Sequence, residues 1–81
     1  MTKAAAISIK LGFEQDLMGV LTSEKDNQEL HELLNDECVS FKEVMQQDAW
    51  VFEDGSYITR SVDDYFIGDD IDMFEIEEEL S

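Results

Sequence analysis

Proline is absent from this 81-residue chain, and glycine occurs only four times. Linkers between domains are usually marked by runs rich in proline, glycine or serine, and no such run interrupts the sequence. A chain of this length is also too short for more than one ordinary domain. We therefore predict a single domain over residues 1–81. Cys38 is the only cysteine, so an intrachain disulfide is excluded, which favours a reducing cytoplasm.

Positive charge is also scarce. Five lysine and arginine residues stand against 21 aspartates and glutamates, and the formal net charge is −16 at pH 7. A small domain stays in solution with a net charge of only about 2–8. DNA, RNA and anionic membranes attract proteins through basic side chains, so the composition argues against all three as direct ligands. It favours a partner protein whose own surface is basic. No run of about 20 apolar residues is present to span a membrane, and we expect a cytoplasmic protein.

The chain nevertheless has enough apolar residues for a core, at 43%, and they include five phenylalanines, two tyrosines and one tryptophan. The acidic excess is unevenly placed along the chain. Residues 1–47 carry nine acids and four lysines, whereas residues 48–81 carry twelve acids and one base, Arg60. We interpret the two parts as a mainly helical half and an acidic hairpin half of one domain.

Residues 6–21 carry two conflicting patterns. From Ile7 to Phe13 apolar residues alternate with polar residues or glycine, which predicts a half-buried strand. Phe13, Leu17 and Leu21 instead have helical spacing. Our interpretation is a strand that runs into a short helix, although either element remains open for this segment.

The middle of the chain is more regular. Apolar residues recur at helical spacing from Leu30 to Met45. They predict a helix from about 26 to 47, with a break near 38–40 that would divide it into two helices.

The strongest local signal is a hairpin in the stretch WVFEDGSYIT. Two β-rich runs flank Asp54-Gly55, a dipeptide preferred in two-residue type I′ turns. Counting outward from such a turn gives two faces, with Trp50, Phe52 and Tyr57 on one and Val51 and Ile58 on the other. A third strand near 65–67 is predicted to extend the hairpin, and residues 71–80 are left as a short helix or strand.

The expected fold class is therefore α+β. We predict a small single domain in which one or two helices pack on an antiparallel β-hairpin or a three-stranded meander.

Residues suited to catalysis or metal binding are few. His31 and Cys38 would stand about 10.5 Å apart along one helix, far beyond the roughly 3 Å at which a base activates a thiol. We interpret Cys38 as a small buried hydrophobe and His31 as an exposed helix residue. The acids within residues 69–75 lack the spacing of a calcium-binding loop. We predict a protein with no enzymatic activity, no cofactor and no specific metal site.

Acids in residues 48–81 come in spaced groups on elements predicted to be rigid. A strand advances about 3.3 Å per residue, close to the rise of about 3.4 Å between phosphates along one strand of DNA. Carboxylates on a sheet and an adjoining helix can thus copy the charge pattern of a duplex, with Trp50, Phe52 and Tyr57 as the core beneath them. The predicted partner-binding residues are Asp54, Asp63, Asp64, Asp69, Asp70, Asp72, Glu75, Glu77, Glu78 and Glu79. The acids within residues 24–37 are the alternative surface.

These features resemble the small acidic phage-encoded inhibitors that mimic DNA, notably some anti-CRISPR proteins. The resemblance rests on the hairpin WVFEDGSYITR, the pairs Asp63-Asp64 and Asp69-Asp70, and the acidic stretch EIEEEL. The resemblance is to the class as a whole and not to a shared motif, because such inhibitors have no motif in common. It implies a target with a positively charged DNA-binding channel, such as a CRISPR effector, a restriction enzyme or another DNA-processing enzyme. The target would be met in the host cytoplasm if a phage encodes the chain.

Two functions are thus carried forward. The first is a non-enzymatic inhibitor that blocks DNA binding by occupying the basic surface of its target. The alternative is an acidic interaction module, such as an immunity protein, an antitoxin or a transcription regulator, that binds a basic partner without mimicking DNA. Adaptation to a salt-rich cytoplasm also yields acidic surfaces, although charge concentrated in one half fits it poorly. The sequence leaves the identity of the target and the oligomeric state open.

Overall fold

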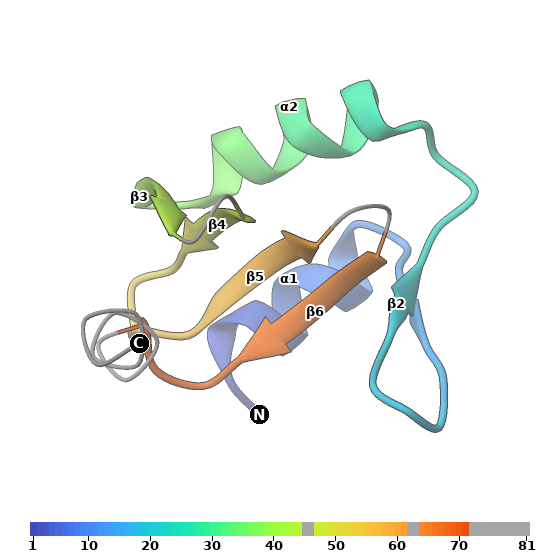
Figure 1. Cartoon of the computed structure of the whole chain (residues 1–81), viewed down its shortest axis with the longest axis horizontal. Coiled ribbons are helices and arrows are strands. Elements are labelled where there is room, and N and C mark those ends of the chain that lie inside the picture. Colours follow the sequence, from blue (N-terminus) through green and yellow to red (C-terminus); the bar gives the residue numbers. More distant parts are fainter. Residues whose placement is uncertain (45–46, 62–63, 72–81) are drawn as a thin grey trace.

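The computed structural model describes residues 1–44, 47–61 and 64–71. Within these residues, two helices and six strands build an α+β fold, which confirms the predicted fold class. The elements are α1 (Lys3–Lys10), β1 (Glu14–Gln15), β2 (Leu21–Thr22), α2 (Asn27–Glu37), β3 (Ser40–Val44), β4 (Gln47–Val51), β5 (Tyr57–Ser61) and β6 (Asp64–Gly68). The strands form one antiparallel sheet in the order β1-β2-β6-β5-β4-β3 (Figure 1). This sheet is larger than the predicted hairpin or meander.

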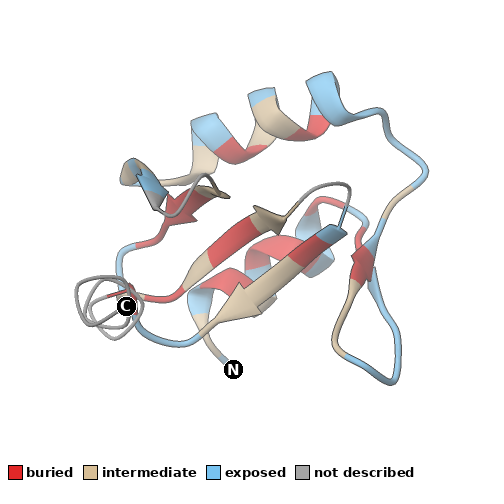
Figure 2. Ribbon diagram, viewed as in Figure 1, coloured by how far each residue is buried: buried red, intermediate tan, exposed pale blue. Residues whose placement is uncertain are grey.

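Both helices contribute to a hydrophobic core on one face of this sheet. Trp50, Ile58 and Ile67 lie opposite one another on β4, β5 and β6, and the inner sides of α1 and α2 pack against that face. The buried members of the core are Ala4, Ile7, Leu11, Phe13, Leu21, Leu30, Leu34, Trp50, Phe52, Ile58 and Tyr65. Figure 2 shows the buried positions of α1 and α2 on the sides that face the strands, with exposed positions on the outer side of α2.

The first element is a helix and not the predicted strand. α1 begins after Thr2, whose hydroxyl accepts a hydrogen bond from the amide of the third helical residue at 3.2 Å. Ala4, Ile7 and Leu11 follow at spacings of three and four and are buried, whereas Ile9 is 63% exposed. The alternation of apolar residues from Ile7 to Phe13 therefore predicted the wrong element. Residues 13–21, predicted as a short helix, instead form β1, β2 and the turn between them.

The second helix is shorter than predicted. α2 ends at Glu37, and Cys38 has an extended backbone with ψ of 155°. The predicted break near 38–40 is the end of the helix, and the next element is the strand β3. Phe41 lies opposite Trp50 on β4, with their ring centroids 5.7 Å apart. The predicted helix after the break was wrong, because the ladder with β4 overrode the helical spacing of this segment.

The predicted hairpin is present as β4 and β5, but its turn has three residues rather than two. The amide of Phe52 donates to the carbonyl of Ser56 at 2.8 Å, and the amide of Gly55 donates to the carbonyl of Phe52 at 3.0 Å. Gly55 has a φ of +87°. This is the three-residue loop with a left-handed glycine in its last position. The predicted two-residue type I′ turn was wrong.

The longer turn shifts the pairing by one residue. Trp50 lies opposite Ile58, and Val51 lies opposite Tyr57. Because side chains alternate between faces, Tyr57 moves to the face opposite Trp50 and Ile58 joins Trp50. Trp50 and Phe52 are buried core residues as predicted. The predicted place of Tyr57 beside them was wrong.

The far face of the sheet holds a smaller apolar cluster. Tyr57 packs there with Ala49, Val51 and Ile71. The predicted third strand near 65–67 is confirmed as β6, and Gly68 at its end lies under the ring of Tyr57. Of the predicted element at 71–80, residues 72–80 lie outside the described residues.

Candidate partner-binding surface

Four of the ten predicted partner-binding residues fall within the described part of the chain. All four are exposed: Asp54, Asp64, Asp69 and Asp70. The other six lie outside it: Asp63, Asp72, Glu75, Glu77, Glu78 and Glu79. The surface is therefore assembled from the acids that the structure places.

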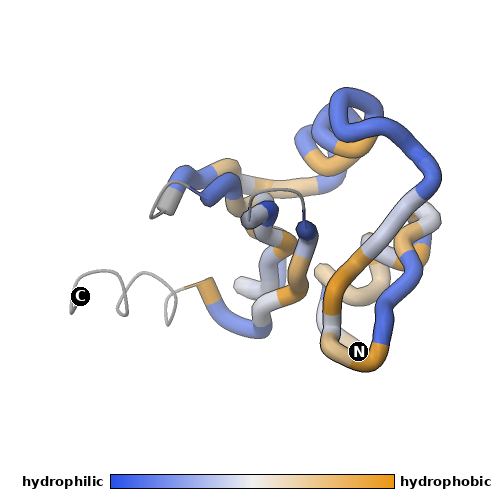
Figure 3. The backbone as a smooth tube through the Cα atoms, turned by 45° about the vertical axis from the view of Figure 1, so that its right-hand side comes forward, coloured by the Kyte–Doolittle hydropathy of each residue, from blue (hydrophilic) through white to orange (hydrophobic). Residues whose placement is uncertain are grey.

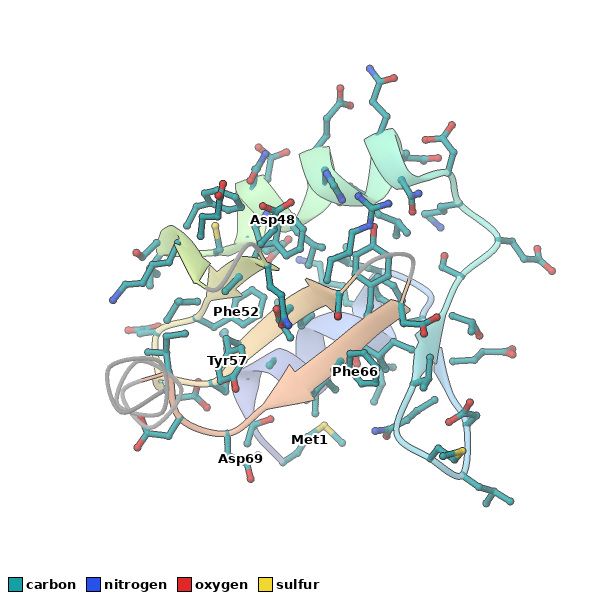
Figure 4. All side chains as sticks on the ribbon, viewed as in Figure 1. Met1, Asp48, Phe52, Tyr57, Phe66 and Asp69 are labelled. Carbon is teal, nitrogen blue, oxygen red and sulfur yellow. The ribbon has the colours of Figure 1, made fainter. Side chains whose placement is uncertain are left out.

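The fold brings three of these four residues to one end of the sheet. The amide of Ile71 donates to the carbonyl of Gly55 at 2.9 Å, which joins the segment after β6 to the turn between β4 and β5. Asp69 lies beyond the arrowhead of β6, at the same end of the sheet as Tyr57 (Figure 4). We call Glu53, Asp54, Asp69 and Asp70 the hairpin-end acids. Asp64 begins β6, about 13 Å along the strand from its last residue, and is not part of this group.

Asp54 has an internal role. Its Oδ2 accepts a hydrogen bond from the amide of Lys3 at 2.8 Å, and its Oδ1 accepts from the amide of Ser56 at 3.1 Å and from the Ser56 hydroxyl. The Ser56 hydroxyl oxygen in turn accepts from the amide of Ala4 at 2.9 Å. The hydroxyl of Ser56 and the amide of Lys3 hold the pKa of the Asp54 carboxyl below its usual value. Its negative charge therefore stabilises the N-terminus of α1, where the helix dipole is positive.

A second group of acids lies on α2. Glu29, Glu32 and Asp36 are exposed, and we call them the α2 acidic face. They are spaced by three and four residues, so they share one side of the helix and span about 10.5 Å along its axis. Sequence reasoning kept residues 24–37 only as an alternative surface. The spacing of these three acids is a signal in the sequence that would have indicated this surface.

The ends of α2 are fixed by two carboxylates. Asp26 caps the first turn, because its Oδ1 accepts from the amide of Glu29 at 2.8 Å. Near the last turn, Glu37 Oε1 pairs with Lys10 Nζ of α1 at 2.7 Å. Both carboxylates are therefore tied to the scaffold that presents the α2 acidic face.

His31 anchors the inner side of α2 to the sheet. Its Nε2 lies 3.1 Å from the hydroxyl of Tyr65, which donates to Oδ1 of Asn27 at 3.1 Å. Its ring also packs against Trp50, with centroids 4.9 Å apart. Burial and the charge of Arg60 lower the pKa of His31. The expectation of an exposed His31 was wrong, since the side chain is partly buried in contact with the sheet.

A second hydrogen bond fixes the same helix. Nε1 of Trp50 donates to Oδ1 of Asn35 at 2.9 Å. Cys38, at the end of α2, is partly buried, and burial raises the pKa of its thiol. A thiol with a raised pKa is protonated at neutral pH and is a weak nucleophile. The contacts of Trp50 with Asn35 and of His31 with Tyr65 hold α2 in place on the sheet.

Two surface hollows of about 390 Å³ each are present among the described residues, and neither contains His31 or Cys38. One is lined by Gly12, Glu14, Thr22, Ser23, Glu24 and Lys25. The other is lined by Met1, Thr2, Lys3, Ala6, Glu53 and Asp54. Within residues 1–44, 47–61 and 64–71, no group of three or more histidine, cysteine or acidic residues has a geometry suited to a metal ion.

Comparisons of the chain with protein-family models, with curated proteins and with solved structures give no match. None of the helices among the described residues is both long enough and apolar enough to cross a membrane.

Proposed function

We propose that this protein is a non-enzymatic inhibitor that occupies the basic nucleic-acid-binding surface of a target protein and competes there with DNA. The observation that carries the proposal is charge density. Residues 1–44, 47–61 and 64–71 carry 15 acids against five bases, a net charge of −10, and the structure they form is 36 Å long. The same length of duplex DNA carries about 21 phosphate charges. The target class is a DNA-processing enzyme with a basic channel, such as a CRISPR effector or a restriction enzyme.

The fixed placement of the carboxylates supports mimicry over diffuse acidity. Glu29, Glu32 and Asp36 give one charge per about 5 Å of helix axis, against one phosphate per about 3.4 Å along a DNA strand. α2 is held by His31 and by the bond between Trp50 and Asn35. Charges on an ordered helix need no further ordering when they meet lysine and arginine side chains, so more of the attraction is retained on binding.

The proposed inhibition requires no chemical step. Lysine and arginine residues that grip phosphates would pair with one of two surfaces, either the α2 acidic face or the hairpin-end acids Glu53, Asp69 and Asp70, because Asp54 is bonded to Lys3 and Ser56. DNA and this protein then exclude each other from the same surface. Because both interactions are ionic, both weaken as salt is raised.

A competition experiment tests the proposal. A fluorescent DNA duplex is bound to purified targets, namely a Cas9-type effector with its guide RNA and a type II restriction enzyme without its metal. The protein is then titrated in and the anisotropy of the DNA is followed. We expect release of the DNA, with a half-maximal inhibitory concentration that rises linearly with the DNA concentration while the inhibition constant stays the same. A ternary complex of target, DNA and this protein would contradict the proposal.

Two variants with equal loss of charge separate a surface from net charge alone. Glu29→Gln/Glu32→Gln removes two charges from α2, and Asp69→Asn/Asp70→Asn removes two from the hairpin end. We expect the pair that contacts the target to weaken binding about tenfold at low salt, from about 0.7 kcal/mol for each contact. Equal effects of both variants would indicate that only the total charge matters, as in adaptation to salt.

An acidic interaction module that does not mimic DNA is the second candidate. Phe41 on the edge strand β3 and Val39, which precedes that strand, favour it because they are 51% and 67% exposed. Exposed apolar side chains beside a strand edge are typical of protein contacts and have no counterpart on a DNA backbone. The ternary complex that contradicts competition is the outcome expected for this candidate.

A further inference from the structure

The turn between β1 and β2 has the same backbone design as the turn between β4 and β5. The amide of Asp16 donates to the carbonyl of Val20 at 3.0 Å, and the amide of Gly19 donates to the carbonyl of Asp16 at 3.1 Å. Gly19 has a φ of +87°, the same value as Gly55. Residues 17–19 thus form a three-residue loop with a left-handed glycine in its last position.

The side chains at the two equivalent positions differ. In the turn between β4 and β5 these positions hold Glu53 and Asp54. In the turn between β1 and β2 they hold Leu17 and Met18, whose exposed fractions are 107% and 88%. Turns are usually built from polar residues. The backbone does not require two large apolar residues here, since the other turn forms without them, and the core makes no use of them.

The apolar pair is presented on an ordered loop. Oδ1 of Asp16 accepts hydrogen bonds from the amides of Met18 and Val20, at 2.8 and 3.0 Å. In Figure 1 the loop extends away from the sheet and from both helices, and in Figure 3 its tip is coloured hydrophobic beside a hydrophilic arm. A side chain on an ordered loop loses little further freedom on binding, so a larger part of the apolar contact becomes affinity.

The charges around the loop indicate the chemistry of its partner. Glu14 and Asp16 are exposed next to the apolar pair, and Glu14 and Glu24 line the hollow at the base of the hairpin together with one base, Lys25, so the acids are in excess there. Carboxylates in this position favour a rim of lysine and arginine around the pocket that receives the pair. They disfavour an anionic membrane, and a second copy of the chain carries the same net charge of −16.

We propose that Leu17 and Met18 form an apolar anchor, which inserts into an apolar pocket of the target protein beside its basic surface. This inference rests on the proposed function for the nature of the target. The two kinds of contact then have separate parts in binding. The carboxylates provide attraction that salt weakens, and the anchor provides a contribution that salt leaves unchanged.

The dependence of affinity on salt tests the anchor. The dissociation constant of the target identified by DNA competition is measured between 50 and 500 mM salt for the wild type and for Leu17→Ser/Met18→Ser. We expect binding about 10- to 100-fold weaker at every salt concentration, with an unchanged slope of log Kd against log salt. Whichever of Glu29→Gln/Glu32→Gln and Asp69→Asn/Asp70→Asn weakens binding provides the contrast, since removing charge contacts lowers the slope.

A matched control separates the anchor from a general loss of apolar surface. Ile9→Ser removes another exposed apolar side chain, from α1, and is expected to bind as the wild type does. Urea denaturation of each variant checks the fold, which the anchor substitutions should leave unchanged because both side chains are exposed.

Each of the other possible results contradicts the anchor, the proposed function or the nature of the partner. Wild-type affinity of Leu17→Ser/Met18→Ser overturns the anchor and leaves competition with DNA standing. A target that binds together with DNA overturns the proposed function, while the anchor is still measured on that complex. Binding to neutral phosphatidylcholine vesicles that depends on Leu17 and Met18 overturns the protein pocket in favour of a membrane. A dimer seen in ultracentrifugation and dissociated by these substitutions overturns the protein pocket in favour of a second copy of the chain. No binding to any tested target overturns both proposals.

Discussion

The turn between β1 and β2 and the turn between β4 and β5 share one backbone design and differ in what their side chains contact. Asp54 in the second turn is exposed, yet it is bonded to Ser56 and to the first amide of α1. Leu17 and Met18 in the first turn are more than four-fifths exposed. Exposure alone therefore does not separate residues that serve the fold from residues that face a partner. The contacts of each side chain make this distinction. They place Asp54 among the residues that stabilise the fold, and Leu17 and Met18 among the residues that face a partner.

The largest effect on stability is expected from the second turn. Ser56 is fully buried, and Ser56→Ala leaves the amide of Ala4 without its acceptor and removes a bond to Asp54. We expect the free energy of unfolding to fall by about 1–3 kcal/mol. Urea denaturation measures it. Leu17→Ser in the first turn is the matched control, and a loss of similar size there would break the comparison.

The two glycines test whether the backbones are equivalent. Gly19→Ala and Gly55→Ala each place a side chain at a φ of +87°. A new Cβ meets nothing closer than 3.7 Å at Gly19 and nothing within 4 Å at Gly55, so the cost comes from the backbone alone. We expect each variant to lose about 1–2 kcal/mol in urea denaturation. Losses that differ by more than twofold would show that the turns are held differently.

The role of Asp54 predicts a dependence on pH. Its pKa is lowered in the fold from an ordinary value of 3.8, so its carboxylate stabilises the fold above that pH and loses this effect as the pH falls through the folded pKa. The wild type should therefore melt at a higher temperature than Asp54→Asn at pH 6. This difference should begin to shrink as the pH falls below about 4, toward the lower pKa of the folded state. Thermal denaturation from pH 6 to pH 2.5 measures the difference.

A control variant isolates the hydrogen bonds of Asp54 from its charge. Glu53→Gln removes the neighbouring charge and leaves the bonds to Ser56 and Lys3 in place. At pH 6 we expect the melting temperature of Glu53→Gln to be at least as high as that of the wild type. If Glu53→Gln and Asp54→Asn behave alike, charge and not capping explains the effect.

The smallest effect on stability is expected when the first turn receives the chemistry of the second. Leu17→Glu/Met18→Asp copies the acidic dipeptide onto the same backbone. We expect the free energy of unfolding to change by no more than about 0.5 kcal/mol, because neither side chain is packed. Binding to the target should fall despite the added negative charge. Stronger binding would show that the position responds to charge and not to apolar contact.

Local sequence predicted the hairpin of β4 and β5 but not its register. Asp54-Gly55 is compatible with a two-residue turn and with the last two positions of a three-residue turn, and the two differ in which residues face the core. Bonds from Asp54 and Ser56 to α1 accompany the longer turn, and they join residues more than 50 positions apart. A pattern along the chain contains no information on that contact.

The strand β3 shows a related limit. The segment Ser40–Val44 continued the helical spacing of α2, and its pairing with β4 overrode that spacing. The same holds for the candidate surface. The helical spacing of the α2 acids can be read from the sequence, whereas the separation of Asp64 from Asp69 and Asp70 depended on where β6 begins and ends.

The sequence by itself determined the net charge of −16, the single cysteine, the α+β class and the apolar residues available for a core. These are properties of composition and of short-range pattern, so they do not depend on which segments meet. Only the tertiary structure decided that Tyr57 leaves the face of Trp50, that Asp54 accepts a hydrogen bond from the first amide of α1, and that Leu17 and Met18 stay in solvent. Hydrogen bonds and burial are made between distant residues, and their partners are chosen when the whole chain packs.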